Sequence, residues 1–188
     1  MKLEDYKKNY LKNEGIRHAQ RVQTLSLKLF RDLSEFFPLM LSQLSTQKNL
    51  LEIAAQLHDI GSLIERELQE PHNKIGAKLI LRSGIDELGE AETLVVAALI
   101  KYHRGKDPDE KHKIFSQLNE AQKAMVLAFA AILRIADALN CEDFTLKHTE
   151  NGFIINPVSK PDKTFFDKKK KLFEKVFETK IELEAAIL

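Results

Sequence analysis

Residues 50–61 read LLEIAAQLHDIG, and this stretch decides the fold. Its apolar residues recur at helical spacing, which predicts a helix inside the core. The helix ends in His58 and Asp59 and is stopped by Gly61. Burying an imidazole beside a carboxylate is costly unless both groups find partners. Taken alone, the pair is best explained as a cap at a helix end. A bound metal cation is the alternative, and further His or Asp residues at the ends of other apolar helices would favour it.

Length and charge restrict the class of protein. The chain has 188 residues without an obvious linker, so we expect one compact domain, with a helical body over 1–140 and a small α+β subdomain over 141–188. The net charge of +1 argues against binding to duplex nucleic acid or to an anionic membrane.

The location of the protein is predicted from its apolar segments. The N-terminus lacks the apolar run of a signal peptide. The longest apolar run, over 124–133, has ten residues, about half of a membrane span. The single cysteine, Cys141, cannot form an internal disulfide. We therefore expect a cytoplasmic protein, and the sequence leaves a homodimer open.

Other apolar helices also bring His or Asp residues to their inward faces or ends. These residues are His18 in a helix over 15–37, His72 just after Pro71, His103 at the end of a helix over 90–103, and Asp137 in a helix over 120–140. Each has an ordinary explanation by itself, because a lone histidine on an apolar stripe is usually a core residue with a local partner. Asp137 can pair with Arg134, one helical turn before it.

The chain changes character after Asn140. Two apolar segments, 144–149 and 153–155, flank Asn151-Gly152, which is a strong hairpin signal. A helix is expected over 164–179 and a strand over 180–185. The predicted fold is therefore a mainly α helical bundle with a small C-terminal antiparallel sheet and a covering helix. The lysines at 168–171 are interpreted as a solvated helix face.

The ordinary explanations do not account for the joint pattern, since each of these residues would then need a private partner in one core. One or two divalent cations would satisfy all of them together. The candidate metal ligands are His18, His58, Asp59, His72, His103 and Asp137. A mixture of imidazole and carboxylate suits Mn, Fe, Co, Ni or Zn rather than calcium.

The order of these residues resembles a known superfamily. His18, then His58-Asp59, then Asp137 on successive helices is similar to the HD-domain metal-dependent phosphohydrolases, and the added His72 and His103 resemble the branch with two metals. More narrowly, three segments are similar to the C-terminal domain of exopolyphosphatase/guanosine pentaphosphate phosphohydrolase (Ppx/GppA) proteins. These segments are AAQLHDIG at 54–61, YHR at 102–104 and LRIADAL at 133–139. The terminal hairpin, helix and strand fit that domain too.

The resemblance implies the roles of the residues. His18, His58, Asp59 and Asp137 would hold one metal, and Asp59, His72 and His103 a second, with Asp59 as the bridge. Two cations about 3.5–4 Å apart can trap a hydroxide that attacks a phosphate ester in line. The cations that would stabilise the developing charge are taken from Arg21, Lys74, Lys101, Arg104 and Arg134. Arg104 and Lys74, together with Asp59, are the catalytic candidates.

The function expected on this basis is a metal-dependent phosphohydrolase (class EC 3.1 or 3.6) acting on a nucleotide or another small phosphorylated molecule. The actin-like phosphatase domain of the similar proteins is not within these 188 residues, so catalysis is expected from the His/Asp cluster. Two alternatives stay open. One is a non-catalytic sensor that binds a nucleotide, guanosine polyphosphate or polyphosphate. The other is a structural interaction domain in which the six residues are replaceable.

Overall fold

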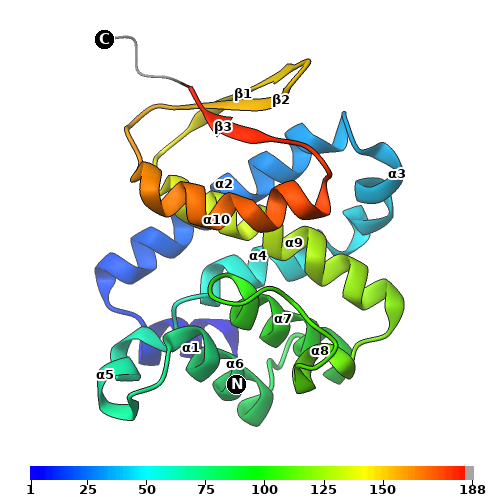
Figure 1. The fold of residues 1–188 in the computed structure, drawn as a ribbon. Coiled ribbons are helices and arrows are strands. Elements are labelled where there is room, and N and C mark those ends of the chain that lie inside the picture. The colour runs from blue at the N-terminus through cyan, green and yellow to red at the C-terminus, as the bar shows by residue number, and fades with distance from the viewer. Residues whose placement is uncertain (185–188) are drawn as a thin grey trace.

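The computed structural model describes residues 1–184, and helices make up most of it (Figure 1). The helical body consists of α1 (Leu3–Tyr10), α2 (Asn13–Ser34), α3 (Pro38–Leu41), the 3-10 helix η1 (Ser42–Gln47), α4 (Lys48–Leu57), the 3-10 helix η2 (Ser62–Ile64), α5 (Glu65–Leu68), α6 (His72–Ser83), α7 (Glu90–Tyr102), α8 (Lys113–Ser116) and α9 (Glu120–Leu139). The C-terminal part consists of β1 (Phe144–Thr149), β2 (Gly152–Pro157), α10 (Lys163–Val176) and β3 (Ile181–Leu183). The predicted mainly α fold with a small C-terminal sheet is confirmed. Ala185, the last residue of the predicted strand, lies outside the described residues.

Helix α9 is the centre of the core. Its second half is apolar on nearly every face and is buried from Ala128 to Leu139. It packs against α2, α7 and α10, and α4 packs in turn against α2 and α7. A capping box at Asn119 starts α9, and Asn140 ends it in the left-handed conformation with φ 39°. Helices α2, α4 and α7 therefore converge on α9, and α6 joins them by packing against α7.

The sheet differs from the prediction in one respect. β1 and β2 form the expected antiparallel hairpin, but β3 pairs with β2 in parallel, so the sheet is mixed. The expectation of an all-antiparallel sheet was wrong because α10 carries the chain back across the sheet before β3 begins. A crossover of this kind returns the next strand in the same direction. Figure 1 shows α10 between the sheet and the helical body.

Over residues 1–184, none of the helices is both long enough and apolar enough to cross a bilayer.

Candidate metal centre

The six predicted ligands come together in one cluster. They form two groups whose ligand atoms lie within 4.8 Å of one another, namely His18 with His58 and Asp137, and Asp59 with His72 and His103. Helices α2, α6 and α9 supply three of them, the turn after α4 supplies His58 and Asp59, and His103 directly follows α7. Residues separated by more than a hundred positions thus share one buried polar site inside the helical body.

Atoms of the first group lie at distances close to those between ligands of one ion. His18 Nε2 is 3.2 Å from His58 Nε2 and 3.3 Å from Asp137 Oδ1. His58 Nε2 is 3.7 Å from the same carboxylate oxygen. Donor atoms bound at about 2.1 Å to one first-row ion stand roughly 3.0–3.4 Å apart. The group therefore fits a divalent cation after movements of a few tenths of an ångström.

Asp59 joins the two groups through its two carboxylate oxygens. Its Oδ2 faces the first group, 3.5 Å from His58 Nε2 and 3.8 Å from His18 Nε2. Its Oδ1 faces the second group, 3.1 Å from His72 Nε2 and 3.7 Å from His103 Nε2. The two histidines of the second group are themselves 3.3 Å apart. Each oxygen of this carboxylate therefore faces a different pair of histidines.

The other ring nitrogen of each histidine is held by an acceptor. Nδ1 of His58 donates to the carbonyl of Ala55 at 2.8 Å, and Nδ1 of His103 donates to that of Ile100 at 2.7 Å. The remaining two pairs are His72 Nδ1 to Glu65 Oε2 at 3.0 Å and His18 Nδ1 to Asn140 Oδ1 at 2.9 Å. In a neutral imidazole, a proton fixed on Nδ1 leaves the lone pair of Nε2 directed at the cluster. His58, whose pKa is raised, must lose its Nε2 proton before it can bind a cation. Metal-binding histidines usually have such a partner.

The charges of the cluster are set by burial and by mutual contact. Burial lowers the pKa of His58, but the carboxylates of Asp59 and Asp137 outweigh it and raise the pKa to about 9. Burial and the ammonium of Lys169 hold the pKa of His103 well below its ordinary value. Burial raises the pKa of Asp137, yet Lys169 and the neighbouring histidines outweigh it and keep the pKa well below normal. The carboxylate is therefore ionised, as a metal ligand must be.

Lys169 was missed as a site residue. The lysine run at 168–171 was interpreted as a solvated face, but the side chain of Lys169 is only 5% exposed and its Nζ donates to Asp137 Oδ2. Nζ also donates to the carbonyl of His103 at 2.7 Å. Phe166 and Leu172 lie three residues before and after Lys169 and are buried, so helical spacing placed it on the inward face of α10. That spacing was the signal for its burial.

The arginine and lysine side chains that were predicted to stabilise charge lie in different parts of the structure. Arg104 Nη1 is 3.1 Å from Nδ1 and 3.2 Å from Nε2 of His72, at the edge of the second group. Lys74 is exposed, and it lies near enough to Lys101 to help lower the pKa of that ammonium. Arg134 points away from the cluster, donating to Asp107 Oδ1 at 2.8 Å and to the carbonyl of Tyr102 at 2.8 Å. It therefore holds the loop that carries Arg104.

Gly61 allows the two halves of the site to approach. A Cβ on Gly61 would stand 2.2 Å from the carbonyl oxygen of His72, which no real Cβ tolerates. Its φ of −81° is ordinary, so the requirement is for space and not for a left-handed backbone. Interpreted from sequence as a helix stop, the glycine in fact lets α6 begin directly against the turn that carries Asp59.

Gly61→Ala is accordingly expected to push His72 away from Asp59. Stability should fall by about 1–3 kcal/mol, the usual cost of overpacking. The affinity of the group of Asp59, His72 and His103 for added Mn²⁺ should fall roughly 10–100-fold, as when the support of a ligand is lost. Urea denaturation and metal titration measure the two effects. Gly89→Ala is the control, because the nearest atom to its Cβ is 3.8 Å away. Unchanged metal binding in Gly61→Ala would contradict the expectation.

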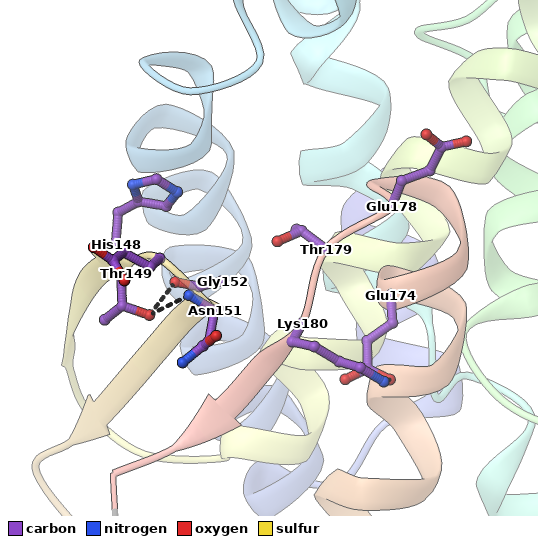
Figure 2. A pocket seen from close by; sticks show the side chains of 9 residues that line it. His148, Thr149, Asn151, Gly152, Glu174, Glu178, Thr179 and Lys180 are labelled. Atoms are coloured by element: carbon purple, nitrogen blue, oxygen red, sulfur yellow. Dashed lines mark hydrogen bonds and ion pairs between the residues drawn. The ribbon is translucent and has the colours of Figure 1, made fainter.

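The surface has two hollows of interest. The larger, about 570 Å³, lies between the hairpin and the α10–β3 connection and is lined by residues that include His148, Thr149, Glu174 and Lys180 (Figure 2). Glu174 Oε2 and Lys180 Nζ pair there at 3.4 Å, and no cluster residue lines it. The smaller, about 250 Å³, is lined by His18 and Asp137. The smaller hollow is therefore the one that belongs to the candidate centre.

The chain matches a known family over most of its length. The family described as Ppx/GppA phosphatase, domain III, matches residues 13–183, which include all six clustered side chains. The chain belongs to this family. Membership relates the chain to phosphatases. The segments AAQLHDIG, YHR and LRIADAL had predicted this family.

A second similarity covers less of the chain. Ribonuclease Y of Chloroflexus aurantiacus is 33% identical over 69 residues, which is 37% of this chain and 12% of that protein. The match therefore spans only a small part of the relative's length, and the activity of the whole relative is not carried over by it.

Proposed function

We propose that this chain is a metal-dependent phosphohydrolase of HD type, acting on a nucleotide or another small phosphoester. One observation carries the proposal: the two oxygens of Asp59 face two separate groups of histidines, at 3.1 Å from His72 and at 3.5 Å from His58. Two groups sharing one carboxylate are typical of centres with two metals.

The residues that would hold the cations follow from this geometry. His18, His58 and Asp137 with Oδ2 of Asp59 would hold one, and His72 and His103 with Oδ1 of Asp59 the other. Mn, Fe, Co, Ni and Zn are the ions that suit imidazole and carboxylate together. When bound, such ions lower the pKa of coordinated water and neutralise charge on a phosphate ester.

The chain itself would bind and orient the substrate. Asp59 is 27% exposed, whereas His58 is fully buried, so the cluster opens to solvent on the Asp59 side. Arg104 is exposed beside His72 and has guanidinium donors that suit the oxygens of a phosphate. His58 and His103 are buried and exclude water from the inner side of the cluster. We assign phosphate binding to Arg104, whose guanidinium lies beside His72. Lys74 is a weaker candidate, because its exposed side chain lies beside Lys101.

Membership of a phosphatase family supports hydrolysis of phosphate bonds. The partial similarity to a protein named ribonuclease Y supports it too, and adds phosphodiesters to the substrates worth testing.

The decisive measurement is elemental analysis of the purified protein, followed by assays with p-nitrophenyl phosphate and a panel of nucleotides. We expect between one and two transition-metal equivalents per chain. Removing them with a chelator should abolish phosphate release, and adding Mn²⁺ should restore it. Metal-replete protein without turnover on the whole panel would refute the enzyme. Stabilisation by a nucleotide without hydrolysis would then indicate a sensor. Absence of metal would refute both.

A further inference from the structure

The hollow of about 250 Å³ extends the candidate centre toward the C-terminal part of the chain. His18 and Asp137 line one side of it, and Lys160, Pro161 and Phe165 line the other. These last residues come from the β2–α10 connection and the first turn of α10. The hollow thus begins at the cluster and ends at residues that have no part in holding a metal.

Phe165 brings a large apolar ring to the hollow. Its side chain is 39% exposed, so part of the ring faces solvent. One side of the ring is fixed, because Lys169 Nζ lies 4.9 Å from the ring centroid. The same ammonium donates to Asp137, so the ring is tied to the metal cluster through one buried side chain. An aromatic face held in place and open to a polar cleft is suited to stacking against another planar group.

The hollow is lined by charges of both signs. Asp162 also lines it, but its Oδ1 accepts the backbone N–H of Phe165 at 3.0 Å and so caps α10. Lys160 is exposed in the same connection and contributes a positive charge. A volume slightly below the roughly 300–1,000 Å³ of pockets for drug-sized ligands suits a nucleobase or a group of similar size.

We propose that this cleft binds the planar organic part of the substrate, with Phe165 as the stacking surface and Lys160 as a cation beside it. The inference rests on the proposed function and narrows it. The substrate class becomes phosphate esters that carry an aromatic base close to the phosphate, such as nucleoside monophosphates. Phe165 sets this specificity and takes no part in the bond cleavage.

The test uses two ligands that cannot be hydrolysed, namely the phosphonate analogue of AMP and the corresponding ribose phosphonate without the base. Both are titrated into Mn²⁺-loaded protein by calorimetry. The wild type should bind the AMP analogue more tightly. Phe165→Ala should weaken that binding about 5- to 100-fold, the effect of losing a stacked aromatic partner. It should change binding of the ribose phosphonate less than about twofold and should leave the metal content as in the wild type.

Phe36→Ala is the matched control, because Phe36 is 42% exposed and packs against His148 and Phe153 at the far end of the chain's sheet. It should leave both affinities unchanged. Equal affinity of the wild type for the two phosphonates, no binding of either, or an equal loss of both in Phe165→Ala would overturn the inference. Hydrolysis is assayed separately on p-nitrophenyl phosphate and on the panel of nucleotides. Base-dependent binding without turnover would therefore refute the enzyme while leaving this subsite standing.

Discussion

Replacing Asp59 with alanine is expected to remove most of the bound divalent metal and to lower kcat/KM on p-nitrophenyl phosphate by about a thousandfold or more. The carboxylate is the group that faces both histidine groups, at 3.1 Å from His72 and 3.5 Å from His58. Metal ions contribute several kcal/mol to the stabilisation of a charged transition state, and each 1.36 kcal/mol is a factor of ten in rate. Elemental analysis and steady-state kinetics on the same preparation measure both losses.

Asp5→Ala is the control for this variant, since Asp5 is an exposed carboxylate on α1. It should keep full metal content and activity. Retention of metal by Asp59→Ala at the level of Asp5→Ala would mean that the cluster is a set of structural hydrogen bonds, and the proposed function would fall with it.

Lys169→Met is expected to destabilise the metal-free protein by about 3–5 kcal/mol, because it leaves a buried carboxylate without its partner. Lys169 Nζ donates to Asp137 Oδ2, and both side chains are almost fully buried. Saturating Mn²⁺ should recover a larger share of stability in this variant than in the wild type, since the cation then supplies the missing positive charge. Urea denaturation with chelator and with Mn²⁺ gives the two free energies of unfolding.

Lys168→Met provides the comparison on the same helix, because Lys168 is exposed. Its free energy of unfolding should change by less than about 0.5 kcal/mol, as is usual for surface substitutions. Adding Asp137→Asn to Lys169→Met should relieve part of the loss, since it removes the unpaired charge. A Lys169→Met protein as stable as Lys168→Met would contradict the role given to this ion pair.

Much of the site could be predicted because its residues conflict with their surroundings. His58 and Asp59 end an apolar helix, and Asp137 interrupts the apolar stripe of α9, so each residue raised the question of what compensates it. Shared divalent cations were predicted because they would compensate all of these residues at once. The closeness of the two groups depends on tertiary packing, and so does the position of Asp59 between them. Both were predicted only from the resemblance.

Other features were not predicted, for physical reasons. The direction of β3 is not encoded in its alternating pattern, since parallel and antiparallel strands alternate alike. Glu65 and Asn140 orient His72 and His18, but nothing in the sequence joins residues that meet across a turn or across 122 positions. Lys169 is different, because helical spacing from Phe166 pointed inward. Its charge, and the lysines on either side of it, concealed that signal.

Helix α10 is made after every ligand of the candidate centre, since the last of them is Asp137 and the helix begins at Lys163. On the ribosome, the carboxylates and imidazoles therefore emerge before the ammonium group that balances Asp137. A chain that ends ahead of α10 would therefore hold Asp137 without the ammonium that pairs with it. The C-terminal helix completes this ion pair only after all six ligands have been synthesised.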